Sequence, residues 1–320
     1  MSIGMLAHFL NDTAQKKLVG TFERLLELLS KGASESVSKA VCKCIPHLAK
    51  FFPDKAKNLV KDHLTKVLTS KEEKVVKAST YCLVGLLKAL GMSTIAELDI
   101  LTQVKNECFE SKKIDPIRKQ AGLFFYDTLS FSMGKSFEVY LTQIFPHILG
   151  CISDTKEPVR QAALSALKTI MATFSNFAIK QALPQFIKEL QNDNWRSKFS
   201  TVEALGNMAY CAPKQISNFL PQIVKSLREI LNDTHEKVHE AAIEAIKKIG
   251  SVIKCPEIGD MLEAIVNALA NTNTHLNYAL KLLLETSFVH AIDAPSLSLL
   301  VPLLDAGLTM HDNQSKQMAA

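Results

Sequence analysis

The distribution of apolar residues between Asp193 and Asp233 predicts two consecutive amphipathic helices. In the second, apolar residues recur at spacings of three, four and seven positions, which places them on one face of a helix with 3.6 residues per turn. They are Ile216, Phe219, Leu220, Ile223, Val224, Leu227, Ile230 and Leu231. Asp233 stands three residues before Glu236, a capping-box pattern for the start of a third helix. One helix pair cannot bury both of its faces, so we expect copies on either side.

The pattern recurs along the chain at intervals of about 40 residues. Prolines that follow an apolar residue lie 38, 37 and 81 residues apart, at Pro146, Pro184, Pro221 and Pro302. Aspartates repeat at 39 and 40 residues, at Asp154, Asp193 and Asp233. A period near 40 with two helices per unit is typical of HEAT repeats. The sequence therefore predicts an all-α chain, an α-solenoid of roughly eight HEAT-type helix pairs.

The predicted helices cover most of the chain. Their ranges are 13–30, 34–52, 54–69, 71–90, 94–110, 115–133, 136–152, 156–174, 177–192, 195–211, 213–231, 234–253, 257–270, 274–289, 294–309 and 312 onward. No linker rich in Ser, Gly or Pro interrupts them, so we expect one continuous array over residues 1–320, least regular at 106–116. Neither end resembles a polar capping repeat. We therefore expect an internal fragment of a longer protein.

Composition is consistent with an intracellular protein. Hydrophobic residues make up 47% of the sequence, and no apolar run reaches the ~18 residues that a membrane span requires. The N-terminus lacks the pattern of a secretory signal. The seven cysteines have no disulfide-framework spacing, which favours reduced and mostly buried thiols.

Residues 235–239 read His-Glu-Lys-Val-His, the letters of a zinc-peptidase motif. Such a motif binds zinc only if both histidines lie on a helix that lines a cleft and a third ligand is available. Here His235 follows Asp233 in the first turn of a predicted helix, and Gly259 stands where the third ligand would be expected. We interpret the two histidines as structural and assign no metal ligand.

Two further features have structural interpretations. Gly134-Lys135-Ser136 lacks the preceding glycine of a P-loop, because Leu129 occupies that position, so we interpret it as a helix end followed by a helix start. Trp195, the single tryptophan, is expected to pack between repeats. No catalytic or cofactor-binding residue is assigned, and the chain is not predicted to be an enzyme.

The strongest charge feature lies between Lys39 and Lys77. This stretch contains ten lysines and four acidic residues, an excess larger than the +5 of the whole chain. One interpretation is a solvated face; the other is a strip that contacts phosphate groups. Lys57 and Lys61 lie four positions apart on one side of a helix, and adjoining helices contribute further lysines. The candidate phosphate-binding residues are Lys50, Lys57, Lys61, Lys74 and Lys77.

The longest informative strings are NWRSKFSTVEALGNMAYCAPKQISNFLPQIVKSLREILND, EKVHEAAIEAIKKIGSVIKCPEI and TSFVHAIDAPSLSLLVPLLDAGL. In these strings the chain resembles the central region of the general-control activators of the initiation factor two alpha kinase. That region is similar to the HEAT domain of translation elongation factor three. The resemblance is dense over about 190–320 and fainter upstream, through SESVSKAV and SFEVYLTQIFPHILGC.

The resemblance implies a non-catalytic, cytoplasmic scaffold of translational control. In this family the region is associated with ribosomes and with an ABC-type ATPase partner, and the scaffold activates the kinase under amino-acid starvation. The kinase-binding segment is expected outside this chain. The alternatives are a fragment of a HEAT-repeat nuclear transport receptor, which would use acidic inner helices against basic cargo, or of a phosphatase scaffold.

Overall fold

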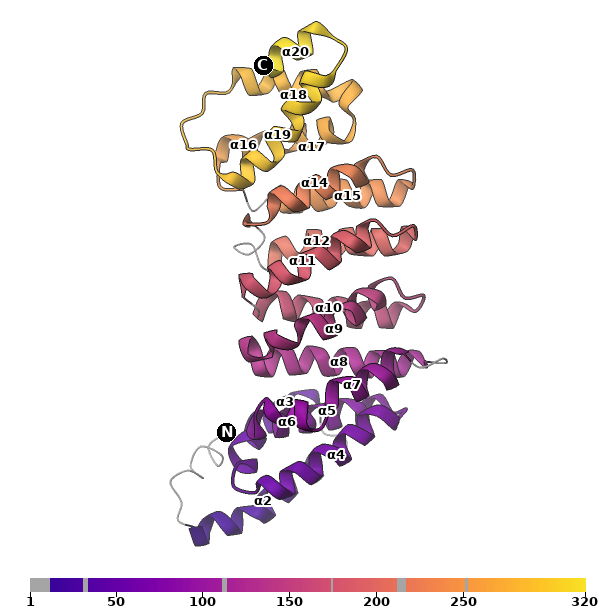
Figure 1. The fold of residues 1–320 in the computed structure, drawn as a ribbon. Helices are drawn as coiled ribbons and strands as arrows, with labels where there is room; N and C mark the ends of the chain where they lie inside the picture. The colour runs from indigo at the N-terminus through magenta and orange to yellow at the C-terminus, as the bar shows by residue number, and fades with distance from the viewer. Residues whose placement is uncertain (1–11, 31–33, 111–113, 174, 212–216, 251–252) are drawn as a thin grey trace. The chain divides into compact units, whose positions relative to one another are not determined.

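The computed structural model describes residues 12–30, 34–110, 114–173, 175–211, 217–250 and 253–320. The chain divides into two compact units, Met1–Phe174 and Ser175–Ala320. In each unit, helices stack as successive pairs, and Figure 1 allows them to be followed by label. The described residues contain no β-strand.

The first unit consists of helices joined by short loops. They are α2 (Asp12–Ser30), α3 (Glu35–Ala49), α4 (Pro53–Thr69), α5 (Glu73–Leu90), α6 (Ser93–Glu97), α7 (Ile100–Lys105), a π-helical turn (Asn106–Glu110), α8 (Pro116–Met133), a 3-10 turn (Gly134–Tyr140), α9 (Leu141–Ile152) and α10 (Glu157–Thr173). They pair as α2 with α3, α4 with α5, α9 with α10, and α6 and α7 with α8, the last through the π-helical turn that follows α7. The second helices α3, α5, α8 and α10 pack against one another in that order.

The second unit is also a stack of helix pairs. Its helices are α11 (Asn176–Leu190), α12 (Trp195–Cys211), α14 (Leu220–Leu231), α15 (Glu236–Gly250), α16 (Pro256–Asp260), α17 (Leu262–Ala270), α18 (Thr272–Glu285), α19 (Ala294–Thr309) and α20 (Asn313–Ala319). The described helices of the two units thus form eight pairs. This confirms the predicted α-solenoid of roughly eight helix pairs.

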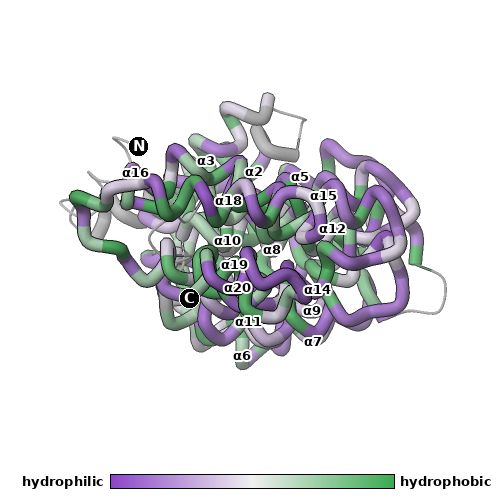
Figure 2. The backbone as a smooth tube through the Cα atoms, turned by 90° about the horizontal axis from the view of Figure 1, so that it is seen from above, coloured by the Kyte–Doolittle hydropathy of each residue, from purple (hydrophilic) through white to green (hydrophobic). Residues whose placement is uncertain are grey.

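The apolar stripe of each helix faces neighbouring helices. In α14 the buried residues are Leu220, Ile223, Val224, Leu227, Ile230 and Leu231, and in α15 they include Val238, Ala242, Ile246 and Ile249. Along the helices, hydrophilic and hydrophobic positions alternate, as Figure 2 shows by colour. The core is therefore a succession of layers between helices, as the 3.6-residue period predicts.

The predicted helix over 94–110 is replaced by α6, α7 and a π-helical turn. The turn places the ring of Phe109 between the rings of Tyr126 and His147. The distances between ring centroids are 5.6 Å to Tyr126 and 5.1 Å to His147. Gly122 in α8 permits this approach, because a Cβ atom there would lie 2.8 Å from Cζ of Phe109. The expectation that the chain is least regular near 106–116 agrees with this geometry, although residues 111–113 lie outside the described part.

Neighbouring pairs are also joined by lysine–aspartate contacts. Nζ of Lys119, in the first turn of α8, lies 2.6 Å from Asp154, and Nζ of Lys198, in the first turn of α12, lies 2.7 Å from Asp233. Each aspartate precedes the second helix of the next pair. Its other carboxylate oxygen accepts a backbone N–H two residues further on, that of Lys156 or His235, at 2.9 Å. The same offset of 79 residues separates the two lysines and the two aspartates.

The Asp233 contacts correct the predicted capping box. Helix α15 begins at Glu236, so Asp233 lies outside the helix instead of at its N-cap. Its carboxylate bonds to the N–H of His235 and to Lys198, whereas the side chain of Glu236 is exposed. Two of the three repeating aspartates, Asp154 and Asp233, therefore order their loops and connect neighbouring pairs.

Candidate functional site

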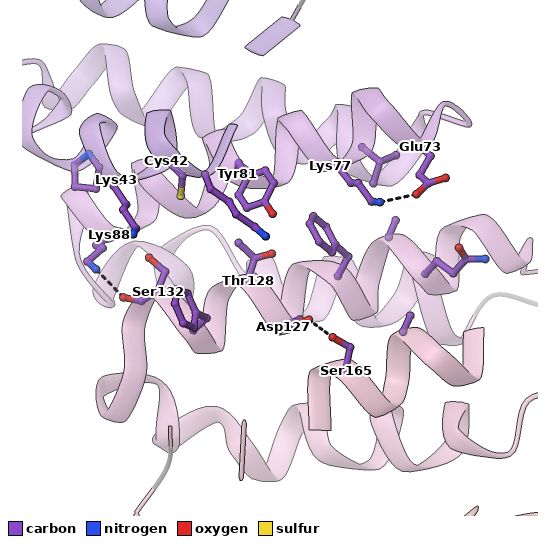
Figure 3. A pocket seen from close by; sticks show the side chains of 18 of the residues that line it. Cys42, Lys43, Glu73, Lys77, Tyr81, Lys88, Asp127, Thr128, Ser132 and Ser165 are labelled. Atoms are coloured by element: carbon purple, nitrogen blue, oxygen red, sulfur yellow. Dashed lines mark hydrogen bonds and ion pairs between the residues drawn. The ribbon is translucent and has the colours of Figure 1, made fainter. Parts of the chain in front are cut away.

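A groove of about 1170 Å³ crosses the second helices of the first unit, from α3 over α5 and α8 to α10. Figure 3 shows Lys43 and Cys42 on α3 facing Thr128 and Ser132 on α8, with Tyr81 and Lys77 of α5 beside them. The basic and acidic residues along it are Lys39, Lys43, Lys50, Lys71, Lys77, Lys88, Glu73 and Asp127. Six lysines against two carboxylates make this groove strongly cationic.

The two carboxylates of the groove are already engaged. Glu73 lies 2.6 Å from Nζ of Lys77, four residues further along α5, and Asp127 accepts a hydrogen bond of 2.9 Å from the hydroxyl of Ser165. Lys88 donates to the backbone carbonyl of Ser132 at 2.8 Å, a contact that does not neutralise its charge. Within the described residues, the side-chain ammonium groups of Lys43, Lys50 and Lys71 have no hydrogen-bond or ion-pair partner.

The floor of the groove is apolar. It includes Pro46, Val76, Ile117, Ala121, Phe124 and Phe131. Phe124 is held edge-on by Tyr81, with 5.5 Å between ring centroids, and Nζ of Lys77 lies 5.9 Å from its ring centre. Phe131 is 67% exposed and Ile117 is 37% exposed, so the groove presents apolar surface to solvent.

The structure separates the five candidate lysines into two groups. Lys50 and Lys77 line the groove. Lys57 and Lys61 lie on α4 outside it, both exposed, and Lys57 is 3.3 Å from Glu97 of α6. Lys74 is exposed in the first turn of α5 and does not line the groove. The predicted strip is thus two surfaces, and the phosphate contacts of these lysines remain a prediction.

Some residues of the groove were not singled out from the sequence. Lys88 and Phe131 lie outside the lysine-rich stretch of the sequence. They line the groove because α5 packs on α3 and α8 packs on α5. Lys39 and Lys43 carry a readable signal, since a spacing of four places them on one side of α3. No local pattern indicated which helix would form the opposite wall.

The cysteine in the groove is not activated. Burial raises the pKa of the Cys42 thiol to about 11, although Lys88 and Lys43 act in the opposite direction. The thiol therefore stays protonated near neutral pH and is a poor nucleophile. Six cysteines are described, and all are free thiols, with Cys44 half-buried and Cys42, Cys82, Cys108, Cys151 and Cys255 buried.

The two histidines of the zinc-like motif have packing roles. The ring of His235 stacks on Trp195, with 4.1 Å between centroids, and Nδ1 of His239 lies 2.6 Å from the carbonyl oxygen of Leu231. Arg196 covers the Trp195 ring at 4.8 Å. Trp195 of α12 thereby packs against the loop before α15, as predicted for a residue between repeats. Within the described residues, no three His, Cys, Asp or Glu side chains are grouped as metal ligands.

The Gly134-Lys135-Ser136 sequence ends a helix. Gly134 follows α8 with a φ of 58°, a left-handed backbone that suits glycine at a helix C-terminus. Its N–H bonds to the carbonyl of Ser130. The following residues form the 3-10 turn, so no array of free N–H groups surrounds a phosphate-sized space.

The stacked helix pairs define an α-solenoid of the HEAT type. The family described as the EF3 N-terminal HEAT repeat matches residues 76–246, and the Elongation factor 3/GNC1 HEAT repeat matches residues 275–320. The chain belongs to this family of elongation-factor-3-type HEAT repeats.

Relatives with curated names agree with this family. The chain is 34% identical to the stalled ribosome sensor GCN1 of Homo sapiens over 318 residues, which is 99% of this chain and 12% of that protein. It is 34% identical to the eIF-2-alpha kinase activator GCN1 of Saccharomyces cerevisiae, over 98% of this chain and 12% of that protein. Elongation factor 3 of Gonapodya prolifera is 27% identical over 73% of this chain and 21% of its own length. The chain thus spans about an eighth of the length of the GCN1 proteins.

Solved structures resemble the chain in fold. The crystal structure of Kap121p superposes with a TM-score of 0.54 and 15% identity, covering 93% of this chain and 33% of that protein. At that identity the likeness concerns the α-solenoid alone. No helix of the described residues is long and apolar enough to cross a membrane.

Proposed function

We propose that the chain is a segment of a non-catalytic scaffold of translational control that associates with ribosomes in the cytoplasm. The observation that carries this proposal is the match over 98–99% of the chain to proteins named stalled ribosome sensor and eIF-2-alpha kinase activator. In this role the whole protein promotes activation of the initiation factor two alpha kinase under amino-acid starvation. The segment that binds the kinase lies outside this chain.

An ABC-type ATPase is the second partner in this proposal. Similarity to elongation factor 3 supports it, because the matched region is the HEAT part of a family named after that factor. The nuclear transport and phosphatase alternatives gain no such support. The likeness to Kap121p is one of fold, and the lysine-lined groove on α3 and α5 is opposite in charge to a surface for basic cargo.

The exposed lysines on α4 are proposed to contact ribosomal RNA. Lys57 and Lys61 lie one turn apart on α4. Among the described residues, the one carboxylate that pairs with either of them is that of Glu97, 3.3 Å from Nζ of Lys57. Lys74 on the following helix is exposed as well, and Lys50 and Lys77 extend the cationic surface into the groove. Such contacts position a protein on RNA without reading its sequence.

Co-sedimentation of the purified chain with eukaryotic ribosomes tests the proposal. Binding should weaken as salt increases, and the Lys57→Gln, Lys61→Gln double variant should flatten the slope of log K against log salt by roughly 1.4–1.8. The matched control changes Lys180 and Lys225, exposed on α11 and α14, to Gln and should leave the slope as it is. Failure of the wild-type chain to sediment with ribosomes would overturn ribosome association. An unchanged slope in the double variant would overturn the role of these two lysines alone.

A further inference from the structure

The groove of the first unit has a length that suits a segment of polypeptide. Lys39 and Lys43 lie on α3 and Lys50 directly follows its last residue, and eleven residues of helix span about 16 Å, or three turns. The volume of about 1170 Å³ exceeds the range of about 300–1,000 Å³ that is typical of sites for small molecules. A row of cations over this distance is complementary to an equally extended row of anions.

The apolar floor restricts the chemistry of that anionic ligand. Pro46, Val76, Ile117 and Ala121 offer aliphatic surface, which a sugar–phosphate backbone does not need. Single-stranded RNA binds where several aromatic rings are free to stack on bases. In this groove Tyr81 is buried, Lys77 lies over Phe124, and Phe131 is the aromatic side chain with a largely exposed ring. A ligand with both carboxylates and apolar side chains can pair with the lysines at the rim and pack on the apolar floor at the same time.

We propose that the groove formed by α3, α5, α8 and α10 binds an acidic amphipathic helix of a partner protein. Its apolar face would lie on the floor, with one large side chain against Phe131, and its acidic residues would pair with Lys43, Lys50 and Lys71. A helix in a groove gains affinity from a few buried anchors, and the charges at the rim fix its position. The site shares Lys50 and Lys77 with the RNA-contacting surface proposed above but does not include Lys57 and Lys61, so variants at those two lysines test the ribosome contact without altering the groove.

Selection from a random 16-residue peptide library displayed on phage tests this proposal. The wild-type chain is the bait, and the Lys43→Glu, Lys50→Glu, Phe131→Ser variant is used for counter-selection. All three side chains are exposed, so the variant should retain the fold, which circular dichroism and thermal unfolding verify. The enriched peptides should carry Asp or Glu on one helical face and Leu, Ile or Phe at spacings of three and four on the other. Failure to enrich any sequence, or enrichment without an acidic excess, would overturn the proposal.

The affinity of one enriched peptide, measured by fluorescence anisotropy, gives the second readout. The groove variant should bind it at least about tenfold more weakly, whereas the Lys57→Gln, Lys61→Gln variant should bind it like wild type. A 20-nucleotide oligouridine is measured in parallel. Tighter binding of the oligouridine than of the peptide, with the same loss in the groove variant, would assign the groove to nucleic acid and overturn the peptide assignment.

Discussion

Lys198 and Asp233 join two helix pairs that are adjacent in the second unit, with 2.7 Å between Nζ and the carboxylate. The side chains are 22% and 12% exposed, so solvent screens this contact less than an ion pair at the surface. The hydrogen bond from Lys198 and the N–H of His235 lower the pKa of the Asp233 carboxyl. The contact therefore stabilises the folded chain at pH values above the ordinary aspartate pKa, and the stabilisation is lost as the pH falls below it.

A double-mutant cycle measures this contact. The cycle of Lys198→Met and Asp233→Asn should give a coupling free energy of unfolding of about 1–2 kcal/mol at pH 7. The control cycle uses Lys281 and Glu285, whose side chains are 70% and 63% exposed and 3.8 Å apart, and should give less than about 0.5 kcal/mol. Equal coupling in the two cycles would contradict a special role for the lysine–aspartate joint.

His63 makes the stability of the first unit depend on pH. It is buried in α4, and burial, with a smaller contribution from Lys66, lowers its pKa to about 4. The folded chain keeps this imidazole neutral, whereas the unfolded chain takes up a proton below about pH 6.5. The contribution to stability is therefore fully present above about pH 6.5 and decreases as the pH falls toward 4.

Between pH 7 and pH 5 this histidine should lower the free energy of unfolding by about 2 kcal/mol. Urea denaturation at the two pH values measures the loss, and His63→Gln should reduce it by about that amount. The control is His275→Gln, at an exposed position in α18, which should show the wild-type loss. A His63→Gln variant with the wild-type pH dependence would show that His63 does not titrate in this way.

Gly206 in α12 permits close contact with α15. A Cβ atom there would lie 2.9 Å from Cα of Ala245, and backbone cannot move aside as a flexible side chain can. We expect Gly206→Ala to lower the free energy of unfolding by about 1–3 kcal/mol. At Gly150, an exposed position in α9 with no atom within 4 Å of the added Cβ, the same change should raise it by about 0.5–1 kcal/mol. Thermal and urea unfolding of the two variants would reveal the opposite signs, and stabilisation at both positions would contradict the close approach.

Leu227 tests the buried face of α14. Its side chain is 0% exposed, and Leu227→Asp would bury a carboxylate without a partner. The loss of stability should be about 3–5 kcal/mol, because a hydrophobic contact is lost and a charge is desolvated. Gln222→Asp, on the exposed side of the same helix, should change stability by less than about 0.5 kcal/mol. Comparable melting curves for the two variants would mean that the buried face has been assigned wrongly.

The sequence predicted the helices and the buried face of each helix, because the apolar period determines both. For this reason Leu220, Ile223, Val224, Leu227 and Leu231 are all buried as expected. The breaks of the predicted helices at 94–110, 136–152 and 257–270 were missed. The first depends on Phe109 fitting between Tyr126 and His147, a contact between different elements. A single period along one helix contains no information about such a contact.

The candidate site was predictable only in part, for a related reason. The excess of lysine between Lys39 and Lys77 is visible in the sequence. Which lysines share a surface depends on how α3, α5 and α8 are rotated against one another. Lys50 and Lys77 therefore line the groove, Lys57 and Lys61 face elsewhere, and Lys88 and Phe131 enter from outside the stretch.

The lysine–aspartate contacts at Lys119–Asp154 and Lys198–Asp233 have a mechanical consequence. Each contact fixes one helix pair to the next near the end of a loop, whereas the layers between helices are held by non-directional apolar packing. Within each unit, a small rotation of one pair can therefore pivot about the pinned end without opening the core. With one such joint described in each unit, bending within a unit would be centred on it, between α8 and α10 in the first unit and between α12 and α15 in the second.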